Sequence, residues 1–422
     1  MSESGNTSVK ADAAEVRALL CELSQQLLAW SWEGVVGYEE IVERVGKTYG
    51  YAETTVTMEA QLAVIKLEAD GDSTFVKVGI PGFPPLAYTQ NVKDLLADIF
   101  AGKLSVAEAR RAIKDLHGKE PPRSPFLVWI GVVVISVGFA VEVTGTWEGL
   151  MWAAITGMAT GLAFLAADRV PGFGKIAQLV ATMAAGVIVM LAFKFGWTVA
   201  APGLLLVSST FVFLPGDSIS TQAYELAQGR WSAGTDRLMY SIMTLALMAT
   251  GAFLAVVLTG SPVSELFPTA QHDAFAWWAV YPGRAVLTLG ILLAFHMSWK
   301  QFTPVLVSIW VVTVAAQLGS MAYGEYAGTF FGAIVGTLLS LWLARKPYSI
   351  SAFVVIVPII FALSPGSHGL RQLETWVAGN TITGVNDLQT VFFVVLAIAL
   401  GMVVGGAIAP RSWRWITRPV DA

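Results

Sequence analysis

The sequence has little charge and only one cysteine. Charged residues make up 13% of the 422 positions, against about 25% in typical soluble proteins. Hydrophobic residues make up 55%, and the mean hydropathy is +0.63. This composition argues against a soluble protein and predicts a membrane protein. A lone Cys21 excludes an intramolecular disulfide framework and a cysteine-based metal cluster, and we expect it to be a small buried core residue beside Leu20 and Leu23.

Motifs for nucleotide, metal or covalent chemistry are also missing from the charged N-terminal part. It contains no GxxxxGK[ST] or GxGxxG loop, and GIPGFPPLAY (79–88) is interpreted as an ordered connection. We therefore expect no cofactor and no enzymatic activity. The first residues, MSESGNTSVKADAAEV, lack the basic and apolar regions of a signal peptide, so we expect the N-terminal part to stay in the cytoplasm.

Charge divides the chain into two parts. Residues 1–125 hold 13 of the 26 Lys and Arg and 18 of the 30 Asp and Glu. The remaining 297 residues hold only 13 and 12. This asymmetry predicts a water-soluble domain over 1–125, ending in the linker KEPPRSP (119–125), followed by a membrane domain. We expect the soluble domain to have a docking, regulatory or gating role.

Periodicity predicts a small α+β fold for the soluble domain. Apolar residues at three- and four-residue spacing predict helices over 13–31 and 38–48. Alternation then predicts a strand over 55–64, joined by an Asp-Gly turn to TFVKV (74–78). Two further helices are predicted, one within NVKDLLADIFAG (91–102) and one that begins at the capping box of Ser105 and Glu108.

Apolar segments after Pro125 predict ten membrane helices. Their ranges are 126–145, 148–167, 176–194, 198–214, 238–259, 281–298, 304–321, 327–344, 349–363 and 388–409. Loop charge agrees with this count, since ten Lys and Arg fall on the predicted cytoplasmic side and three on the outer side. We therefore expect both termini to be cytoplasmic. The three outer residues are Lys194, Arg284 and Arg371.

Two similar motifs predict an internal repeat. FLPGDS (213–218) follows the fourth span, and LSPGSH (363–368) follows the ninth. Identical residues recur at a constant offset of 150: Pro215/Pro365, Gly216/Gly366, Gln222/Gln372 and Gly229/Gly379. A unit of five spans used twice must be inserted in opposite orientations, so we expect inverted repeats over 126–260 and 281–410. Interrupted helices at equivalent positions of inverted repeats indicate the substrate site of a secondary transporter.

The Pro-Gly motifs are predicted to end a membrane helix and to begin a short new one. Asp217 or Ser218, and Ser367, are its expected N-caps, where free N–H groups suit a substrate carboxylate. In the first copy Ser218, Gln222 and Glu225 share one helical face, opposite the stripe of Ile219, Ala223 and Leu226; in the second the same offsets give His368, Gln372 and Thr375. The alternative is an interfacial amphipathic helix that closes a loop.

Other polar residues have simpler interpretations. Glu142, late in the first span, either carries protons or is exposed near the outer end. His296 has a pKa range that suits titration near neutral pH, although a lone interfacial histidine is more often just solvated. Arg237 opens the fifth span and either snorkels to the surface or follows the charge rule of the cytoplasmic side.

Together, these segments resemble the bacterial threonine/serine exporter family from about residue 13 to 410. The resemblance rests on the domain order, on IFAGKLSVAEARRAI (99–113), LPGDSISTQAYELAQGRWSAGTDRL (214–238) and SPGSHGLRQL (364–373), and on ten spans as five plus five. Its most specific positions are Pro215, Gly216, Glu225, Gly229, Gly234 and Arg237. The family often has Asp and Asn where this chain has Glu225 and Thr221. The resemblance implies export of small amino acids, driven by the membrane potential or a proton gradient.

The sequence hypothesis is thus a secondary active exporter of small amino acids such as threonine and serine. It would work in a bacterial inner membrane by alternating access, with protons and lipid as further partners and possible assembly into a homo-oligomer. A small-solute or ion channel and a membrane sensor remain alternatives. The predicted substrate-binding residues are Pro215, Gly216, Asp217, Ser218, Thr221, Gln222, Pro365, Gly366, Ser367, His368 and Gln372. The predicted proton carriers are Glu225, Glu142 and Glu374, and the predicted structural or gating residues are Gly229, Gly234 and Arg237.

Overall fold

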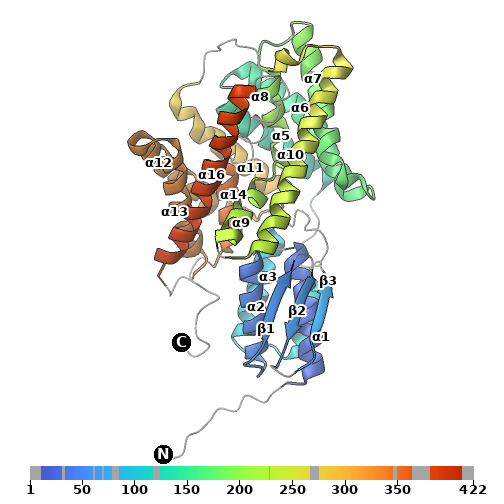
Figure 1. The fold of residues 1–422 in the computed structure, drawn as a ribbon, viewed down its shortest axis with the longest axis vertical. Coiled ribbons are helices and arrows are strands. Elements are labelled where there is room, and N and C mark those ends of the chain that lie inside the picture. The colour runs from blue at the N-terminus through green and yellow to red at the C-terminus, as the bar shows by residue number, and fades with distance from the viewer. Residues whose placement is uncertain are drawn as a thin grey trace, which may run out of the picture.

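The structure is a computed structural model, in which a small N-terminal part lies at one end of a long helical part (Figure 1). It describes residues 11–30, 34–59, 62–68, 71–77, 85–116, 124–227, 229–266, 275–345, 349–363 and 381–410. The predicted motif around Pro365, with Gly366, Ser367, His368, Gln372 and Glu374, lies outside the described residues.

The described residues of the N-terminal part form four α-helices and one sheet. The elements are α1 (Ala13–Trp30), α2 (Gly34–Thr48), β1 (Thr55–Glu59), β2 (Leu62–Lys66), β3 (Thr74–Lys77), α3 (Leu86–Phe100) and α4 (Val106–Asp115). The predicted capping box is present at the start of α4. The Ser105 N–H donates to Glu108 Oε2 at 2.8 Å, and the Glu108 N–H donates to Ser105 Oγ at 3.4 Å. Cys21 is only partly buried against the apolar core of this part, and burial raises the pKa of its thiol.

The predicted strand over 55–64 is wrong, because the chain turns back within it. β1 pairs with β2 through Glu59 opposite Leu62, and β2 pairs with β3, so the sheet is antiparallel in the order β1-β2-β3. Reversal changes which residues face the core. Leu62 is 40% exposed, whereas Ala63 and Ile65 are buried. The run LAVIK (62–66) is apolar on both faces, so its alternation could not reveal the turn.

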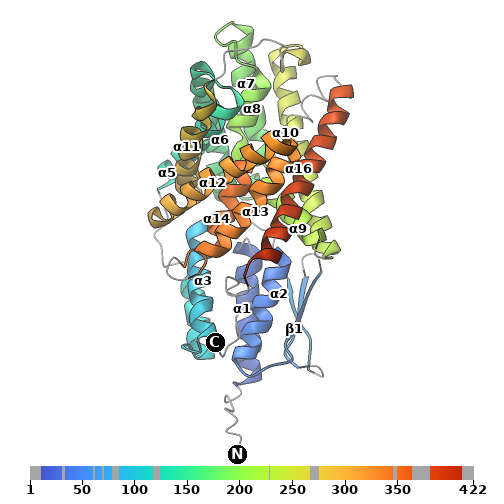
Figure 2. The same ribbon diagram turned by 90° about the vertical axis from the view of Figure 1, so that its left-hand side faces the viewer.

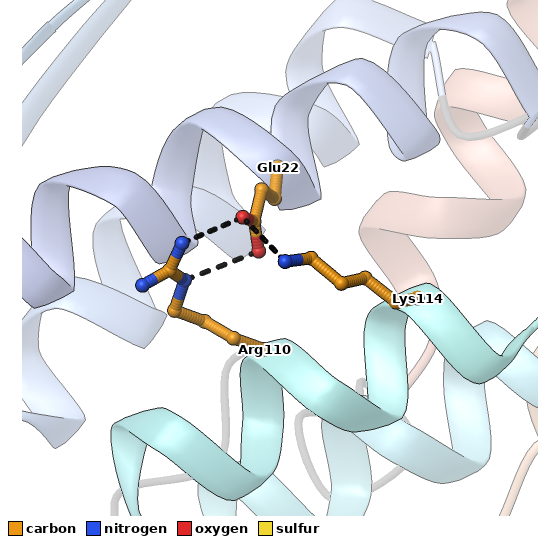
Figure 3. Close-up of polar contacts among 3 residues, drawn as sticks. All are labelled: Glu22, Arg110 and Lys114. Atoms are coloured by element: carbon orange, nitrogen blue, oxygen red, sulfur yellow. Dashed lines mark hydrogen bonds and ion pairs between the residues drawn. The ribbon is translucent and has the colours of Figure 1, made fainter.

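An ion-pair cluster joins α1 to α4 (Figure 3). Glu22 accepts hydrogen bonds from Arg110, with Nη2 to Oε1 at 2.8 Å and Nε to Oε2 at 3.2 Å. The Lys114 ammonium lies 3.5 Å from Glu22 Oε1. The bonds from Arg110 hold the pKa of Glu22 below its usual range, although partial burial opposes them.

We predict a pH-dependent role for this cluster. Because the folded-state pKa of Glu22 is lowered, its stabilisation is present above the unfolded-state value of about 4.3 and is lost as the pH falls through the folded-state value. Glu22→Gln should therefore speed hydrogen exchange of the α4 amides near pH 7, but not well below pH 4. Asp115→Asn, which changes an exposed acid at the end of α4, is the control. An effect of Glu22→Gln that grows towards low pH would contradict this account.

The helical part consists mostly of long apolar helices, with a few shorter ones between them. They are α5 (Pro125–Val143), α6 (Trp147–Arg169), α7 (Ala177–Lys194), α8 (Pro202–Ser209), α9 (Gly216–Ala227), α10 (Trp231–Thr259), α11 (Val280–Ala294), α12 (Trp299–Tyr323), α13 (Glu325–Leu343), α14 (Ala352–Leu363) and α16 (Thr381–Ile408). Within the described ranges, seven helices are long and apolar enough to cross a membrane, or eight if the bent pair 202–209 and 211–223 counts as one span. Each of the ten predicted ranges overlaps a helix, but the number of spans stays a prediction.

Glycines allow α5 and α11 to pack backbone against backbone. A Cβ at Gly131 would lie 2.4 Å from the Ala294 nitrogen, and one at Gly138 would lie 2.4 Å from the Leu287 nitrogen. Seven residues forward along α5 therefore correspond to seven residues back along α11, so the two helices are antiparallel. From the α11 side, a Cβ at Gly290 would lie 2.5 Å from the Ile135 nitrogen. Small residues at such a seam permit the close approach that holds membrane helices together.

The same helix pairs are in contact in both halves of the helical part. α6–α7, α7–α8, α6–α8 and α7–α10 correspond to α12–α13, α13–α14, α12–α14 and α13–α16. Glycines recur at these contacts with the same offset of 150, at Gly186/Gly336 and Gly251/Gly401. The antiparallel helices α5 and α11 are the first helices of the two halves. This arrangement is compatible with the predicted inverted repeat, and both the repeat and its boundaries stay a prediction.

The first turn of α3 is bonded to the helical part. The Leu86 N–H donates to the Phe295 carbonyl at 2.7 Å, and the Ala87 N–H donates to the His296 carbonyl at 3.1 Å. The first N–H groups of a helix have no acceptor within it, and carbonyl groups of the loop after α11 serve as acceptors for those of α3. His296, in that loop, has a positive φ of 53°.

Side chains of α3 bind the loop between α13 and α14. The buried Lys93 ammonium donates to the carbonyls of Ala344 at 2.8 Å and Ile350 at 3.0 Å. Gln90 Oε1 accepts from the Ser351 N–H at 2.7 Å. Helix α3 thus joins two loops of the second half to the N-terminal part, and Figure 2 shows it directly below α14.

We predict that the glycine seam is required for stability. Gly138→Ala places a methyl group against the α11 backbone, and overpacking of this kind costs about 1 to 3 kcal/mol. The variant should therefore unfold at a lower temperature than the wild type in detergent. Gly406→Ala is the matched control, because a Cβ there meets nothing within 4 Å and alanine favours a helix. Equal melting temperatures for the two variants would contradict the packing argument.

Candidate functional site

The candidate site begins where the chain breaks before α9. Helix α8 ends at Ser209, a 3₁₀ turn covers Phe211–Phe213, and α9 begins at Gly216. The prediction of Asp217 or Ser218 as N-cap is wrong. The Ile219 N–H donates to the Pro215 carbonyl at 2.8 Å, so Pro215 occupies the N-cap position and the two residues lie in the first turn.

The polar face of α9 is buried. Ser218, Gln222 and Glu225 all have buried side chains, and Glu225 is only 1% exposed. On the predicted apolar stripe, Ala223 and Leu226 are only half-buried. An interfacial amphipathic helix would turn its polar face towards water, so the structure does not fit that alternative.

Helices from both halves of the chain enclose α9. It contacts α10 in the first half, α14 and α16 in the second, and α2 in the N-terminal part. Figure 2 shows α9 beside α16, next to the N-terminal part. Any relative motion of the halves would therefore change the surroundings of its polar side chains.

An ion pair joins α9 to α10. Arg237 Nε donates to Glu225 Oε2 at 3.0 Å, and the arginine side chain is 27% exposed. Both residues were predicted from the sequence as functional candidates, but the ion pair between them was not. Burying a carboxylate is costly unless it is paired and hydrogen-bonded, and Arg237 provides the counter-charge. The pair places one positive and one negative group side by side within the helical packing.

Glycines shape the connection between α9 and α10. Gly229 has a φ of 79°, and its N–H donates to the Leu226 carbonyl at 3.0 Å, while the Arg230 N–H donates to the Glu225 carbonyl at 2.9 Å. This is a Schellman motif, in which the left-handed position favours glycine. At Gly234 a Cβ would lie 2.6 Å from Leu226 Cγ, so only glycine allows α10 to approach α9 this closely.

The same connection contacts the N-terminal part. The Arg230 guanidinium forms a salt bridge with Glu39 of α2. Burial raises the pKa of Glu39, and the charge of Arg230 opposes this shift. The turn that follows the candidate site is therefore tied to the domain beside it.

Two acceptors on α9 lack partners. Within the described part of the chain, Ser220 Oγ and Gln222 Oε1 are buried and have no hydrogen-bond partner. Leaving a buried polar group unsatisfied costs about 1 to 3 kcal/mol, so such groups indicate a site where a ligand can bond. Sequence reasoning missed Ser220, because it lies on the opposite side of the helix from Ser218, Gln222 and Glu225.

The other predicted residues are dispersed. Thr221 is half-buried on α9, and the side chain of Asp217 lies outside the described residues. Glu142 is far from α9 in the chain and pairs instead with Arg284 of α11, with Oε2 2.7 Å from Nη2. Arg284 had been considered only for its loop charge, and nothing in the local sequence indicates that it meets Glu142.

These features define the class of protein. Helices long and apolar enough to cross a membrane surround a short helix whose polar face is buried. Ionisable residues inside such packing are rare and typically mark a pathway for ions or substrates. The molecule is a polytopic helical membrane protein.

The comparison with protein families identifies the group within this class. Residues 35–259 match the family described as "Putative threonine/serine exporter" (ThrE), and this match covers 225 of 422 residues and includes α9. The chain belongs to this family, as its sequence motifs indicated. Neither the comparison with curated proteins nor that with solved structures gave a match.

We predict that Arg237 is needed to keep Glu225 buried. Arg237→Gln removes the positive charge beside the buried carboxylate, and breaking a buried pair by removing one partner costs about 3 to 5 kcal/mol. Thermal unfolding in detergent should show a clear loss, which the double variant Glu225→Gln with Arg237→Gln partly restores. Lys103→Gln, which breaks the exposed pair with Asp98, is the control and should change little. A double variant as unstable as Arg237→Gln would contradict the pairing account.

Proposed function

We propose that the protein is a secondary active transporter that exports small hydroxylated amino acids, namely threonine and serine. It would work in a bacterial inner membrane with both termini in the cytoplasm, by alternating access coupled to protons. Family membership supports a threonine/serine exporter. The observation that carries the proposal is the buried polar face of α9, where the Gln222 Oε1 acceptor, unpartnered within the described residues, lies one turn before the carboxylate of an ion pair.

A zwitterionic amino acid matches this site in charge. Its ammonium would replace Arg237 as the partner of Glu225, and its carboxylate would replace Glu225 as the partner of Arg237. Both protein charges would then stay compensated while substrate is bound, which avoids the cost of a lone buried charge. The two charged groups of an amino acid share one carbon atom, so they suit two side chains that are already in contact at 3.0 Å.

This arrangement disfavours a carboxylate held at the start of α9. Ser218 and Glu225 are seven residues apart, which is about 10 Å along a helix. One amino acid cannot give its ammonium to Glu225 and its carboxylate to the first turn. The unpartnered acceptor of Gln222, one turn before Glu225, is better placed to accept the substrate hydroxyl.

Proton coupling would follow from competition at Glu225. A protonated Glu225 is neutral and cannot pair with an ammonium group, so proton and substrate exclude each other at this carboxyl. Exclusive binding of this kind, together with alternating access, produces antiport. The site lies between the halves of the chain, where α9 of the first half contacts α14 and α16 of the second. A relative motion of the halves would open it first to one side and then to the other.

We predict that purified protein in liposomes exchanges labelled threonine and serine for unlabelled substrate loaded on the other side of the membrane. The label should accumulate against its own concentration gradient. Glu225→Gln should lower the rate of proton-driven transport about ten- to a hundredfold, the effect expected when a charge-assisted contact is lost. Glu325→Gln, an exposed acid at the start of α13, is the matched control.

Three outcomes would contradict parts of the proposal. If neither amino acid moves in the wild type, the substrate assignment is wrong. If flux occurs without accumulation against a gradient, the protein is a channel and not a carrier. Equal loss in Glu225→Gln and Glu325→Gln would remove Glu225 from the mechanism.

A further inference from the structure

Arg284 is a buried cation whose bonding capacity is only partly used. Its side chain is 8% exposed, and its Nη2 lies 2.7 Å from Glu142 Oε2. Its Nε and Nη1 are buried and, within the described residues, have no hydrogen-bond partner. A guanidinium carries five N–H donors and cannot lose its charge, so this side chain keeps donors for a further acceptor.

The pair lies at the end of the α5–α11 seam away from the N-terminal part. Near it, the Phe275 N–H donates to the Gly145 carbonyl at 2.8 Å, which closes the loop before α11 onto the end of α5. At the opposite end of α11, Phe295 contacts α3. Arg284 is therefore separated from the α9–α10 turn, which contacts the N-terminal part, by most of the length of the seam.

Packing does not require this pair. Gly131 and Gly138 of α5 correspond to Gly283 and Gly290 of α11 at an offset of 152, and the two helices meet through these glycines. At the same offset, the equivalents of Glu142 and Arg284 are Ala294 and Val132. At the other end of the seam, the equivalent positions hold two apolar residues, and the helices associate there without charge. The charged pair therefore serves a purpose other than helix association.

The two partners differ in their freedom to move. The Glu142 side chain is 42% exposed, whereas Arg284 is enclosed. An exposed carboxylate can leave for water at small cost, but a buried guanidinium cannot, and it then needs another anion. A carboxylate is the natural replacement, because planar guanidinium and carboxylate groups form paired hydrogen bonds.

We propose that Arg284 is a second carboxylate-binding residue, which takes the carboxylate of the transported amino acid at the end of the molecule remote from the N-terminal part. Glu142 occupies Arg284 while this end is closed and empty. The inference rests on the proposed function, and it adds a subsite on the path by which substrate leaves. A simple clasp between α5 and α11 is the alternative.

The two single variants separate these possibilities, because a clasp is broken equally by either. A carboxylate site predicts opposite effects. Arg284→Gln should raise the KM for threonine supplied at the remote side about ten- to a hundredfold, and leave the KM at the other side unchanged. Glu142→Gln removes the competing carboxylate and should lower the KM at the remote side. Arg169→Gln, an exposed arginine at the end of α6, is the control.

A binding measurement tests the site without transport. N-acetylthreonine keeps the carboxylate but has no ammonium, and threoninamide has the ammonium but no carboxylate. In detergent, N-acetylthreonine should raise the melting temperature of Glu142→Gln more than that of the wild type, and should raise that of Arg284→Gln less than that of the wild type. Threoninamide should act equally on all three. Arg284→Lys, which keeps the charge, should retain part of the N-acetylthreonine shift, and an unchanged threoninamide shift in Arg284→Gln shows that this variant is folded.

The result that would overturn the inference is a change of the same sign in both variants, whether in KM or in the melting shift. An unchanged KM at the remote side in Arg284→Gln would also overturn it. Failure of threonine transport in the wild type, with the N-acetylthreonine shifts still present, would remove the proposed function and leave the carboxylate site in place.

Discussion

Buried hydrogen-bonding groups need partners, and this constraint governs the packing around α9. Helix α9 carries Ser218, Gln222 and Glu225 into buried positions. Its carboxylate is compensated by Arg237, and its end is closed by a Schellman motif at Gly229. Within the described part of the chain, Ser220 Oγ and Gln222 Oε1 remain unsatisfied. A chain that keeps such groups inside a membrane bundle does so at a cost in stability, which a binding role explains.

Close backbone contact at the α5–α11 seam sets the frame around this helix. Glycines bring the antiparallel helices α5 and α11 together, and each of them is followed by a set of helices. Helix α9 belongs to the set that follows α5, and it contacts α14 and α16 of the set that follows α11. The seam is symmetric in its glycines but not in its ends, where only one end carries Glu142 and Arg284.

Local patterns in the sequence predicted most helices well, since apolar spacing and hydropathy are properties of each segment. The hairpin turn after Glu59 was missed because LAVIK is apolar on both faces. The N-cap was misplaced because Pro215 offers no side-chain signal for that position. Ion pairs such as Glu142–Arg284 depend on helices far apart in the chain, which no local pattern relates. The recurrence of Gly186 and Gly251 at Gly336 and Gly401 was available in the sequence and would have strengthened the repeat.

The central claim is that α9 lies inside a pathway that opens during transport. Ser220, with a side chain that is 0% exposed, is its most direct reporter. A single cysteine can be placed there by Ser220→Cys in a Cys21→Ala background and labelled with a membrane-impermeant thiol reagent in liposomes. The account predicts slow labelling at rest and faster labelling while threonine is exchanged. Rapid labelling that is indifferent to threonine would contradict it, because α9 would then be a surface helix.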